Sequence, residues 1–195
     1  DAVVRGYIER DEAVGAELMI IKDRKIVWNR THGWADREKK TRLEPGSIYC
    51  VRSQTKTFVG TAVQMLIDDG KLKLDDPASK FLPAFDNESH RAITIQQLLE
   101  HRSGLSLSSL VKTDHKNLKS VQEVAELAGK SALEFAPGAK FNYSDDGTDT
   151  LTAIIEKVSG QSADSFIIER ILEPLGMSDT IPVVRPDDPR RSKQI

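Results

Sequence analysis

The sequence has little cysteine and no excess of either charge. Cys50 is the single cysteine among 195 residues, so an internal disulfide and a cysteine-based zinc site are both excluded. The 28 Lys and Arg residues nearly balance the 30 Asp and Glu residues, which gives a net charge of −2. Because phosphate binding needs a basic surplus, this balance argues against nucleic acid as a partner.

Long apolar runs and metal-ligand spacings are also missing. No stretch approaches the roughly 18 apolar residues of a membrane-spanning helix, so we expect no membrane span. The four histidines are scattered, without a His-Glu-x-x-His spacing, and we expect neither a metal nor a cofactor. The chain begins Asp-Ala-Val-Val, with no initiator Met and no signal peptide, which suggests a mature or trimmed form.

The first fifty residues are typical of β-structure. Two apolar runs, 16–21 and 25–28, flank a polar Lys-Asp-Arg turn and predict a β-hairpin. Residues 31–35 are expected to form a third extended piece. Residues 47–51 are expected to form another short strand after the turn signal Glu-Pro-Gly.

After residue 57 the apolar residues repeat every three and four positions, which is typical of helices. The first predicted helix ends at Gly70, and Thr94 opens a short helix through His101 with a capping-box pattern. The remaining predicted boundaries are Ser120 and Gly129 for one helix, Gly160 as the end of another, and Ser162 and Pro174 for the last. Strands followed by helices indicate an α+β fold, or part of a larger one.

The tetrapeptide Ser53-Gln-Thr-Lys56 pairs a nucleophile with a base. Ser53 is expected in the first helical turn, with Lys56 on the same face. Partial desolvation and the positive helix end are expected to lower the pKa of Lys56. The alternative is an ordinary helix-start serine beside a solvated lysine. A second Ser-x-x-Lys, at Ser109–Lys112, lies in a polar loop without a helical pattern and is interpreted as a chance match.

Other candidate residues have ordinary structural explanations. Tyr143 precedes a predicted helix and suits an aromatic anchor, with Asp145 or Asp146 as the helix cap. Cys50 lies in the expected strand and is interpreted as filling space. His101 at a helix end is interpreted as a C-terminal residue of that helix rather than as a base.

Six sequence blocks nevertheless occur in a familiar order along nearly the whole chain. They are IYCVRSQTKT (48–57), GKLKLDDP (70–77), ITIQQLLEHRSGL (93–105), PGAKFNYSD (137–145), IEKVSG (155–160) and PLGM (174–177). Together they resemble the serine β-lactamase and penicillin-binding-protein-like hydrolases. The branch is the one with class C β-lactamases, D-Ala-D-Ala carboxypeptidases, D-aminopeptidases and family VIII esterases.

The resemblance implies a serine hydrolase. Ser53 would attack a carbonyl and form an acyl-enzyme, and its backbone N–H would supply half of an oxyanion hole. Lys56 together with Tyr143 would transfer the proton. Asp145 is assigned to substrate binding. The substrate would be a small molecule or peptide that presents an ester, amide or β-lactam carbonyl.

The resemblance also implies an antiparallel sheet domain packed on a mostly helical domain. Residues 1–57 would belong to the sheet domain and lead into the nucleophile helix, and residues 58–195 would form the helical domain. A periplasmic or secreted location is favoured by the same resemblance.

Two departures from the family pattern leave an alternative open. Asp145 stands where the family usually has Asn, and the third motif, Lys-Thr-Gly or His-x-Gly on a later strand, is absent. We therefore expect an N-terminal portion, whose sheet is completed by a C-terminal segment or a second chain. The alternative function is a catalytically silent binding or scaffolding module.

Overall fold

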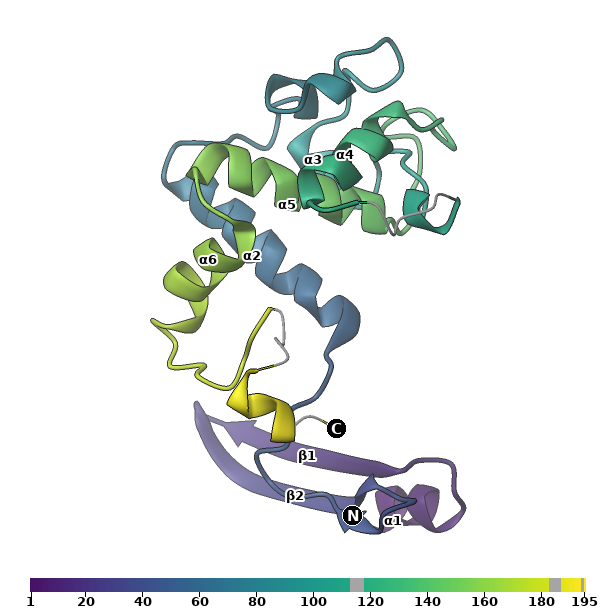
Figure 1. Cartoon of the computed structure of the whole chain (residues 1–195), viewed down its shortest axis with the longest axis vertical. Coiled ribbons are helices and arrows are strands. Elements are labelled where there is room, and N and C mark those ends of the chain that lie inside the picture. The colour runs from purple at the N-terminus through teal and green to yellow at the C-terminus, as the bar shows by residue number, and fades with distance from the viewer. Residues whose placement is uncertain (113–117, 183–186, 194) are drawn as a thin grey trace. The chain divides into compact units, whose positions relative to one another are not determined.

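The structure, a computed structural model, describes residues 1–112, 118–182, 187–193 and 195. The chain divides into two compact units (Figure 1). Unit 1 comprises Asp1–Arg52 and Asp179–Ile195, and unit 2 comprises Ser53–Ser178. The division into domains at residue 57 stays a prediction. Within the described residues, no helix is both long enough and apolar enough to cross a membrane.

Unit 1 is built on an antiparallel sheet with the strand order β1-β2-β3. The predicted hairpin is confirmed as β1 (Gly15–Lys22) and β2 (Lys25–Asp36). Residues 31–35 are extended as predicted, but they continue β2 without a break instead of forming a third piece, and Gly33 still pairs with Gly15.

The third strand of unit 1 is not the predicted one. β3 is Thr41–Arg42 and pairs with the end of β2, whereas residues 47–51 form a single bridge residue and no strand. The edge of β2 at Trp34 is thus already occupied by β3, and the apolar run 47–51 has no place beside it. The remaining elements are helix α1 (Ala2–Glu9) and a 3₁₀ turn at Pro189–Lys193.

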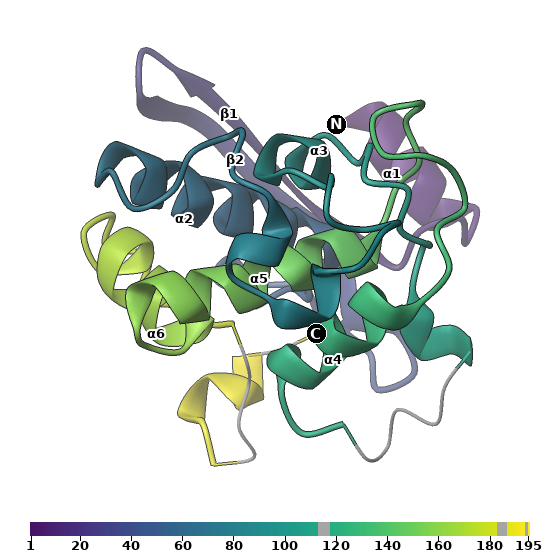
Figure 2. The ribbon, with the colours of Figure 1, turned by 90° about the horizontal axis from the view of Figure 1, so that it is seen from above.

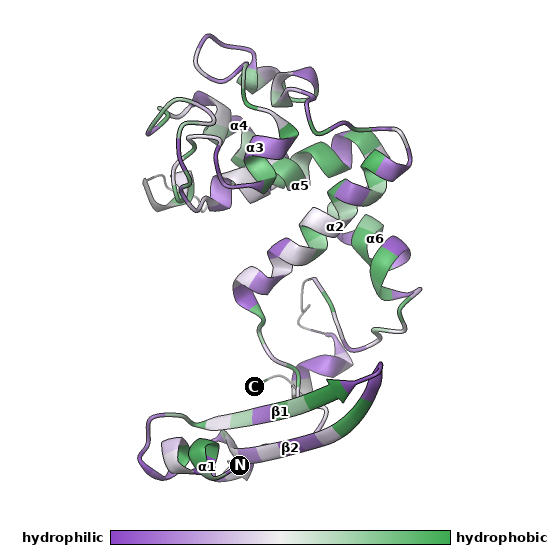
Figure 3. Ribbon diagram, turned by 180° about the vertical axis from the view of Figure 1, so that it is seen from behind, coloured by the Kyte–Doolittle hydropathy of each residue, from purple (hydrophilic) through white to green (hydrophobic). Residues whose placement is uncertain are grey.

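The tip of the β1–β2 hairpin is apolar and exposed. Asp23 and Arg24 form its turn with φ of +51° and +61°, the left-handed geometry of a tight two-residue hairpin. Leu18, further along β1 from the turn, is half-buried. Figure 3 shows both strands as strongly hydrophobic next to the turn. The exposed apolar residues are Met19, Ile20, Ile21, Ile26 and Val27.

Unit 2 is helical, as the sequence predicts. Its helices are α2 (Thr55–Asp68), α3 (Ile95–Leu99), α4 (Val121–Lys130), α5 (Asp145–Ser159) and α6 (Ala163–Ile167). Shorter elements are 3₁₀ turns at Ala78–Lys80, Pro83–Phe85 and Ser109–Lys112, and a π-helical turn at Ile168–Leu172. Within residues 53–112 and 118–178, β-pairing is limited to one bridge between Pro77 and Thr94.

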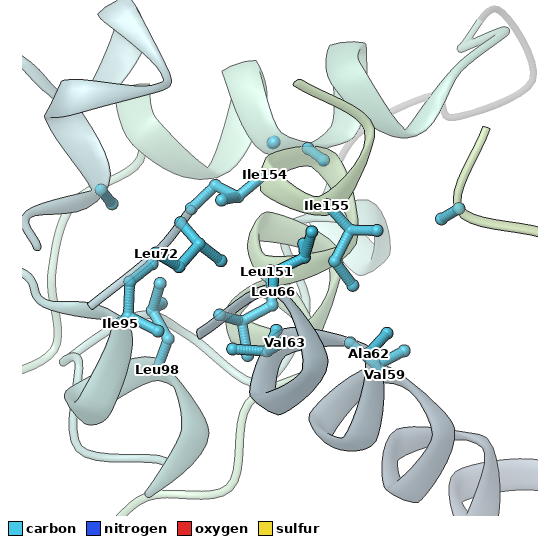
Figure 4. Close-up of a cluster of buried hydrophobic side chains, with 14 of the residues drawn as sticks. Val59, Ala62, Val63, Leu66, Leu72, Ile95, Leu98, Leu151, Ile154 and Ile155 are labelled. Atoms are coloured by element: carbon cyan, nitrogen blue, oxygen red, sulfur yellow. The ribbon is translucent and has the colours of Figure 1, made fainter. Parts of the chain in front are cut away.

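Helix α5 lies at the centre of unit 2 and packs against α2, α3, α4 and α6 (Figure 2). Figure 4 shows the buried side chains that α5, α2 and α3 contribute to this core. Ile154 and Val63 are fully buried, and burying side chains of this size contributes about 1.5–3 kcal/mol each. The core therefore fixes the N-terminal end of α5 relative to α2, and the candidate site lies there.

Glycines at helix ends behave as predicted in two cases and not in a third. Gly70 and Gly160 have φ of +71° and +77° just beyond α2 and α5. The prediction that Gly129 ends its helix is wrong, because Gly129 lies inside α4. A Cβ there would lie 2.8 Å from Phe85 Cδ2 and 2.9 Å from the carbonyl of Ala84. Close packing, not helix termination, therefore requires this glycine.

Candidate active site

Ser53 lies directly before α2, in a 3₁₀ turn at Arg52–Gln54. The prediction that Ser53 lies in the first turn of the α-helix is wrong, because α2 begins two residues later, at Thr55. Arg52 has φ of +49°, a conformation uncommon for residues other than glycine, and it turns the chain sharply into the helix. Ser53 is exposed in this turn. Its hydroxyl is therefore accessible to a substrate.

Lys56 lies in the first turn of α2 and forms an ion pair with Asp145 of α5. Lys56 Nζ donates to Asp145 Oδ1 at 2.6 Å, across 89 positions of sequence. The Lys56 side chain is 21% exposed and the Asp145 side chain 44% exposed. The packing of α5 against α2 thus brings together two charged groups that the sequence analysis assigned to one site.

The pKa of Lys56 is raised, which contradicts the sequence expectation. Burial alone lowers the pKa of Lys56, but hydrogen bonding to Asp145 and Tyr143, together with their charges, outweighs it. Desolvation and the helix end lower the pKa of Lys56, whereas a carboxylate at contact distance favours the ammonium form, and here the carboxylate outweighs them.

Tyr143, two residues before α5, completes the group. The Lys56 Nζ atom lies 4.8 Å from the centroid of the Tyr143 ring. Hydrogen bonding from Lys56, and then from Ser53, lowers the pKa of the Tyr143 phenol. The structure therefore brings the three predicted catalytic side chains, and Asp145, into one cluster.

Ser144, rather than either aspartate, caps α5. Its hydroxyl accepts the backbone N–H of Gly147 at 3.0 Å, so the prediction of Asp145 or Asp146 as the cap is wrong. Both carboxylates are consequently free for other partners, while their charge in the first turn still suits the positive helix end. Asp145 turns to Lys56, and Asp146 turns to the interior.

Asp146 is a fully buried carboxylate that binds the segment 106–109. It accepts from Ser106 Oγ at 2.9 Å, from Ser109 Oγ at 2.6 Å and from the Ser109 backbone N–H at 2.8 Å. Ser109, predicted in a polar loop, is therefore buried in a 3₁₀ turn with its hydroxyl engaged. The second Ser-x-x-Lys has a structural partner and no exposed nucleophile.

Asp149 lies one helical turn after Asp145. Burial, followed by the charges of Asp146 and Asp145, raises the pKa of Asp149 to about 6. Sequence reasoning missed this residue, because only the fold shows how deeply its carboxyl group is set.

Two other sequence candidates differ from their interpretation. Cys50 is exposed and does not fill space, because the strand expected around it does not form. His101 lies just beyond α3, as predicted, but its ring also stacks on Tyr143 at 4.6 Å between centroids. Within the described ranges, no group of three or more His, Cys, Asp or Glu residues could hold a metal ion.

An exposed serine at a helix start, beside a phenol that also interacts with an amine, is an arrangement suited to acyl transfer. Comparison of the sequence with protein-family models agrees, because the Beta-lactamase family model matches residues 1–193. The chain belongs to the beta-lactamase family.

Curated relatives fall within the same family. The chain is 32% identical over 185 residues to Protein flp of Staphylococcus aureus (strain MW2), covering 92% of this chain and 37% of that protein. It is 30% identical over 195 residues to Esterase EstB of Burkholderia gladioli, covering 92% of this chain and 50% of that protein. The chain thus spans half or less of these relatives.

Solved structures show the same fold. EstCE1, described as a hydrolase with promiscuous acyltransferase activity, matches with a TM-score of 0.80 and 26% identity, over 90% of this chain and 50% of that one. The D-amino acid amidase from Ochrobactrum anthropi SV3 matches with a TM-score of 0.79 and 25% identity, over 93% and 52%. The predicted β-lactamase/transpeptidase-like fold is confirmed, here as a small antiparallel sheet and helices.

Proposed function

We propose that the whole protein is a serine hydrolase that forms an acyl-enzyme at Ser53 on an ester, amide or β-lactam carbonyl. The observation that carries this proposal is the contact group of Ser53, Lys56 and Tyr143 at the start of α2. The names of the relatives support it, because they include an esterase and a D-amino acid amidase.

The charges of the group assign the proton transfers. Lys56 has a raised pKa and stays an ammonium, whereas Tyr143 has a lowered pKa and lies beside Ser53. Lys56 stabilises the phenolate form of Tyr143, and the phenolate Oη accepts the Ser53 proton as Oγ bonds to the carbonyl carbon, which leaves Tyr143 as a neutral phenol. Tyr143 then protonates the leaving alcohol or amine. In deacylation, Tyr143 takes a proton from the attacking water, and Ser53 regains one as the acid is released.

Asp145 is proposed to bind both Lys56 and the substrate. One carboxylate oxygen accepts from Lys56, and the side chain remains 44% exposed, so its other oxygen can accept from a substrate N–H or O–H. A family member with Asn at this position would offer an amide instead of a charge. A cationic or hydrogen-donating substrate group is therefore favoured here.

The second candidate, a catalytically silent module, rests on the same ion pair. Asp145 holds Lys56 in its charged form, which removes the lysine as a neutral base. In this case Ser53 would not react, and the site would only bind its ligand.

Covalent labelling of the whole protein with a fluorophosphonate probe separates the two functions. If the protein is a hydrolase, the wild type should be labelled, and Ser53→Ala should abolish the labelling without changing the melting temperature. Ser109→Ala is the control from the other Ser-x-x-Lys. It should keep its labelling but melt at lower temperature, because it removes a buried hydrogen bond to Asp146, typically about 1.5–3 kcal/mol. No labelling of the wild type would favour the silent module, and equal loss from both substitutions would reject Ser53 as the nucleophile.

A further inference from the structure

His101 contacts Tyr143 and both of its neighbours in the chain. The backbone N–H of Asn142 donates to the His101 carbonyl at 2.8 Å, and the backbone N–H of Ser144 donates to His101 Nδ1 at 3.2 Å. The His101 ring also stacks on the Tyr143 ring, with centroids 4.6 Å apart and planes inclined by 32°. One residue therefore binds the chain on both sides of Tyr143 and the face of its ring.

The backbone conformation of His101 is one that usually belongs to glycine. His101 follows the last residues of α3 with φ of +55°. Its N–H donates to Leu98 O at 3.2 Å, and the N–H of Arg102 donates to Gln97 O at 2.7 Å. These two bonds define a Schellman helix end, whose left-handed position favours glycine and costs other residues about 1–2 kcal/mol. The left-handed conformation does not itself assign a role to the histidine, and the contacts of its side chain carry the argument.

The hydrogen bond from Ser144 fixes the protonation state of the imidazole. Because a backbone N–H donates to Nδ1, that nitrogen is an acceptor, and the ring is neutral with its proton on Nε2. The pKa of His101 is lowered by burial and then by the charge of Lys56, and these two effects outweigh the charge of Asp145 and the backbone hydrogen bond with Ser144, which raise it. Protonation at Nδ1 would place its hydrogen against the N–H hydrogen of Ser144 and break the hydrogen bond between the two residues.

We propose that His101 is a positioning residue, whose neutral imidazole holds the Tyr143 hydroxyl in place beside Ser53 and Lys56. This inference rests on the proposed function, since it assigns a role within the same site. His101 does not contact the reacting atoms. It acts through the ring and backbone of Tyr143.

The substitution His101→Gly gives the sharpest test, because glycine is the preferred residue at this backbone position. A purely structural helix end would be kept or improved, and both activity and melting temperature would hold. If the side chain positions Tyr143, kcat of the whole protein on a chromogenic ester should fall about 10- to 100-fold with KM within about twofold. The melting temperature should change little, because relief of the left-handed conformation offsets the loss of the hydrogen bond from Ser144.

His101→Asn is the conservative variant and Lys40→Gly the matched control. Asparagine tolerates the left-handed conformation and places an acceptor oxygen towards Ser144, so it should recover part of the lost kcat. Lys40 has the same φ of +55° in unit 1 and receives the same substitution outside the site, so kcat should not change.

Titration of the Tyr143 phenol gives a readout that needs no turnover. Tyrosinate absorbance, assigned with Tyr143→Phe, should show the lowered pKa of Tyr143 returning towards its ordinary value in His101→Gly. If the wild type neither labels nor turns over, the proposed function fails while this titration still tests His101. Unchanged kcat and unchanged Tyr143 titration in His101→Gly would overturn the inference.

Discussion

The substitution Asp145→Asn removes the negative charge next to Lys56, and an ester substrate without a cationic group confines the effect on kcat/KM to the proton transfers. Asparagine has the size of aspartate and keeps an oxygen that can accept from Lys56 Nζ, now 2.6 Å from Asp145 Oδ1. The negative charge of Asp145 raises the pKa of Lys56 and also that of Tyr143. Whichever of these two groups must lose a proton for catalysis, the substitution makes that loss easier. The acidic limb of the kcat/KM profile should therefore move to lower pH.

The size of the effect follows from exposure. A hydrogen bond to a charged group contributes about 1.5–3 kcal/mol when buried. Asp145 is 44% exposed, and solvent screening reduces the charge contribution to about 1 kcal/mol. A free energy of about 1 kcal/mol changes a protonation equilibrium constant by about fivefold. At a fixed pH on the acidic limb, kcat/KM of the Asp145→Asn variant should be about fivefold above the wild type.

The assay is a pH series of kcat/KM for a chromogenic ester with the whole protein. Asp69→Asn is the matched control, because Asp69 pairs with Arg170 beyond the other end of α2, roughly 20 Å from Lys56 along the helix. It removes the same charge from unit 2 and should leave the profile unchanged. An unchanged profile in Asp145→Asn, or an equal shift in both variants, would refute the reasoning.

Three further predictions concern the proton pair, the half-buried acid Asp149 and the hairpin. Lys56→Ala should lower kcat at least about a hundredfold. In a double-mutant cycle, the loss of kcat in the double variant should be smaller than the product of the losses from Lys56→Ala and Tyr143→Phe, and multiplicative losses would refute a shared role. Asp149 has a pKa raised to about 6, so its ionisation opposes folding increasingly as pH rises from about 4 to 6. Asp149→Asn should therefore raise the free energy of unfolding by up to about 3 kcal/mol at pH 7.5 and change it little at pH 4, as followed by urea titration; an equal gain at both pH values would contradict this. Residues 1–195 expressed alone should aggregate through the exposed hairpin tip and show no ester hydrolysis, whereas the double substitution Ile20→Thr and Val27→Thr should reduce light scattering. A monomeric, active wild-type chain would reject this last prediction.

Much of the helical unit could be predicted because its signals are local. Thr94 forms the expected capping box and Ser162 the expected cap, since a side-chain oxygen and a backbone N–H three residues on need no distant partner. Gly160 ends α5 for the same local reason. The prediction for Gly129 is wrong, because a glycine is required there by the close approach of Phe85 from another part of the chain.

The candidate site was predictable in its members but not in its electrostatics. Ser53, Lys56 and Tyr143 came from sequence blocks, and the fold brings them together. The resemblance could place the carboxylate of Asp145 near Lys56, but only the fold gives the contact between these two residues, 89 positions apart, that decides the direction of the Lys56 pKa shift. The contact of His101 with Tyr143 was missed for the same reason.

The buried carboxylate of Asp146 has a consequence for exchanging parts between relatives. It joins the start of α5 to Ser106 and Ser109 through four hydrogen bonds, and the Asp145 N–H adds a bond to the carbonyl of Leu107. Moving this segment away from α5 would leave a buried charge without donors, which is strongly unfavourable. The segment 106–109 and the first turn of α5 should therefore be exchanged together between relatives. A chimera that exchanges the segment alone should fold poorly, whereas one that carries both pieces retains the donors and the acceptor together.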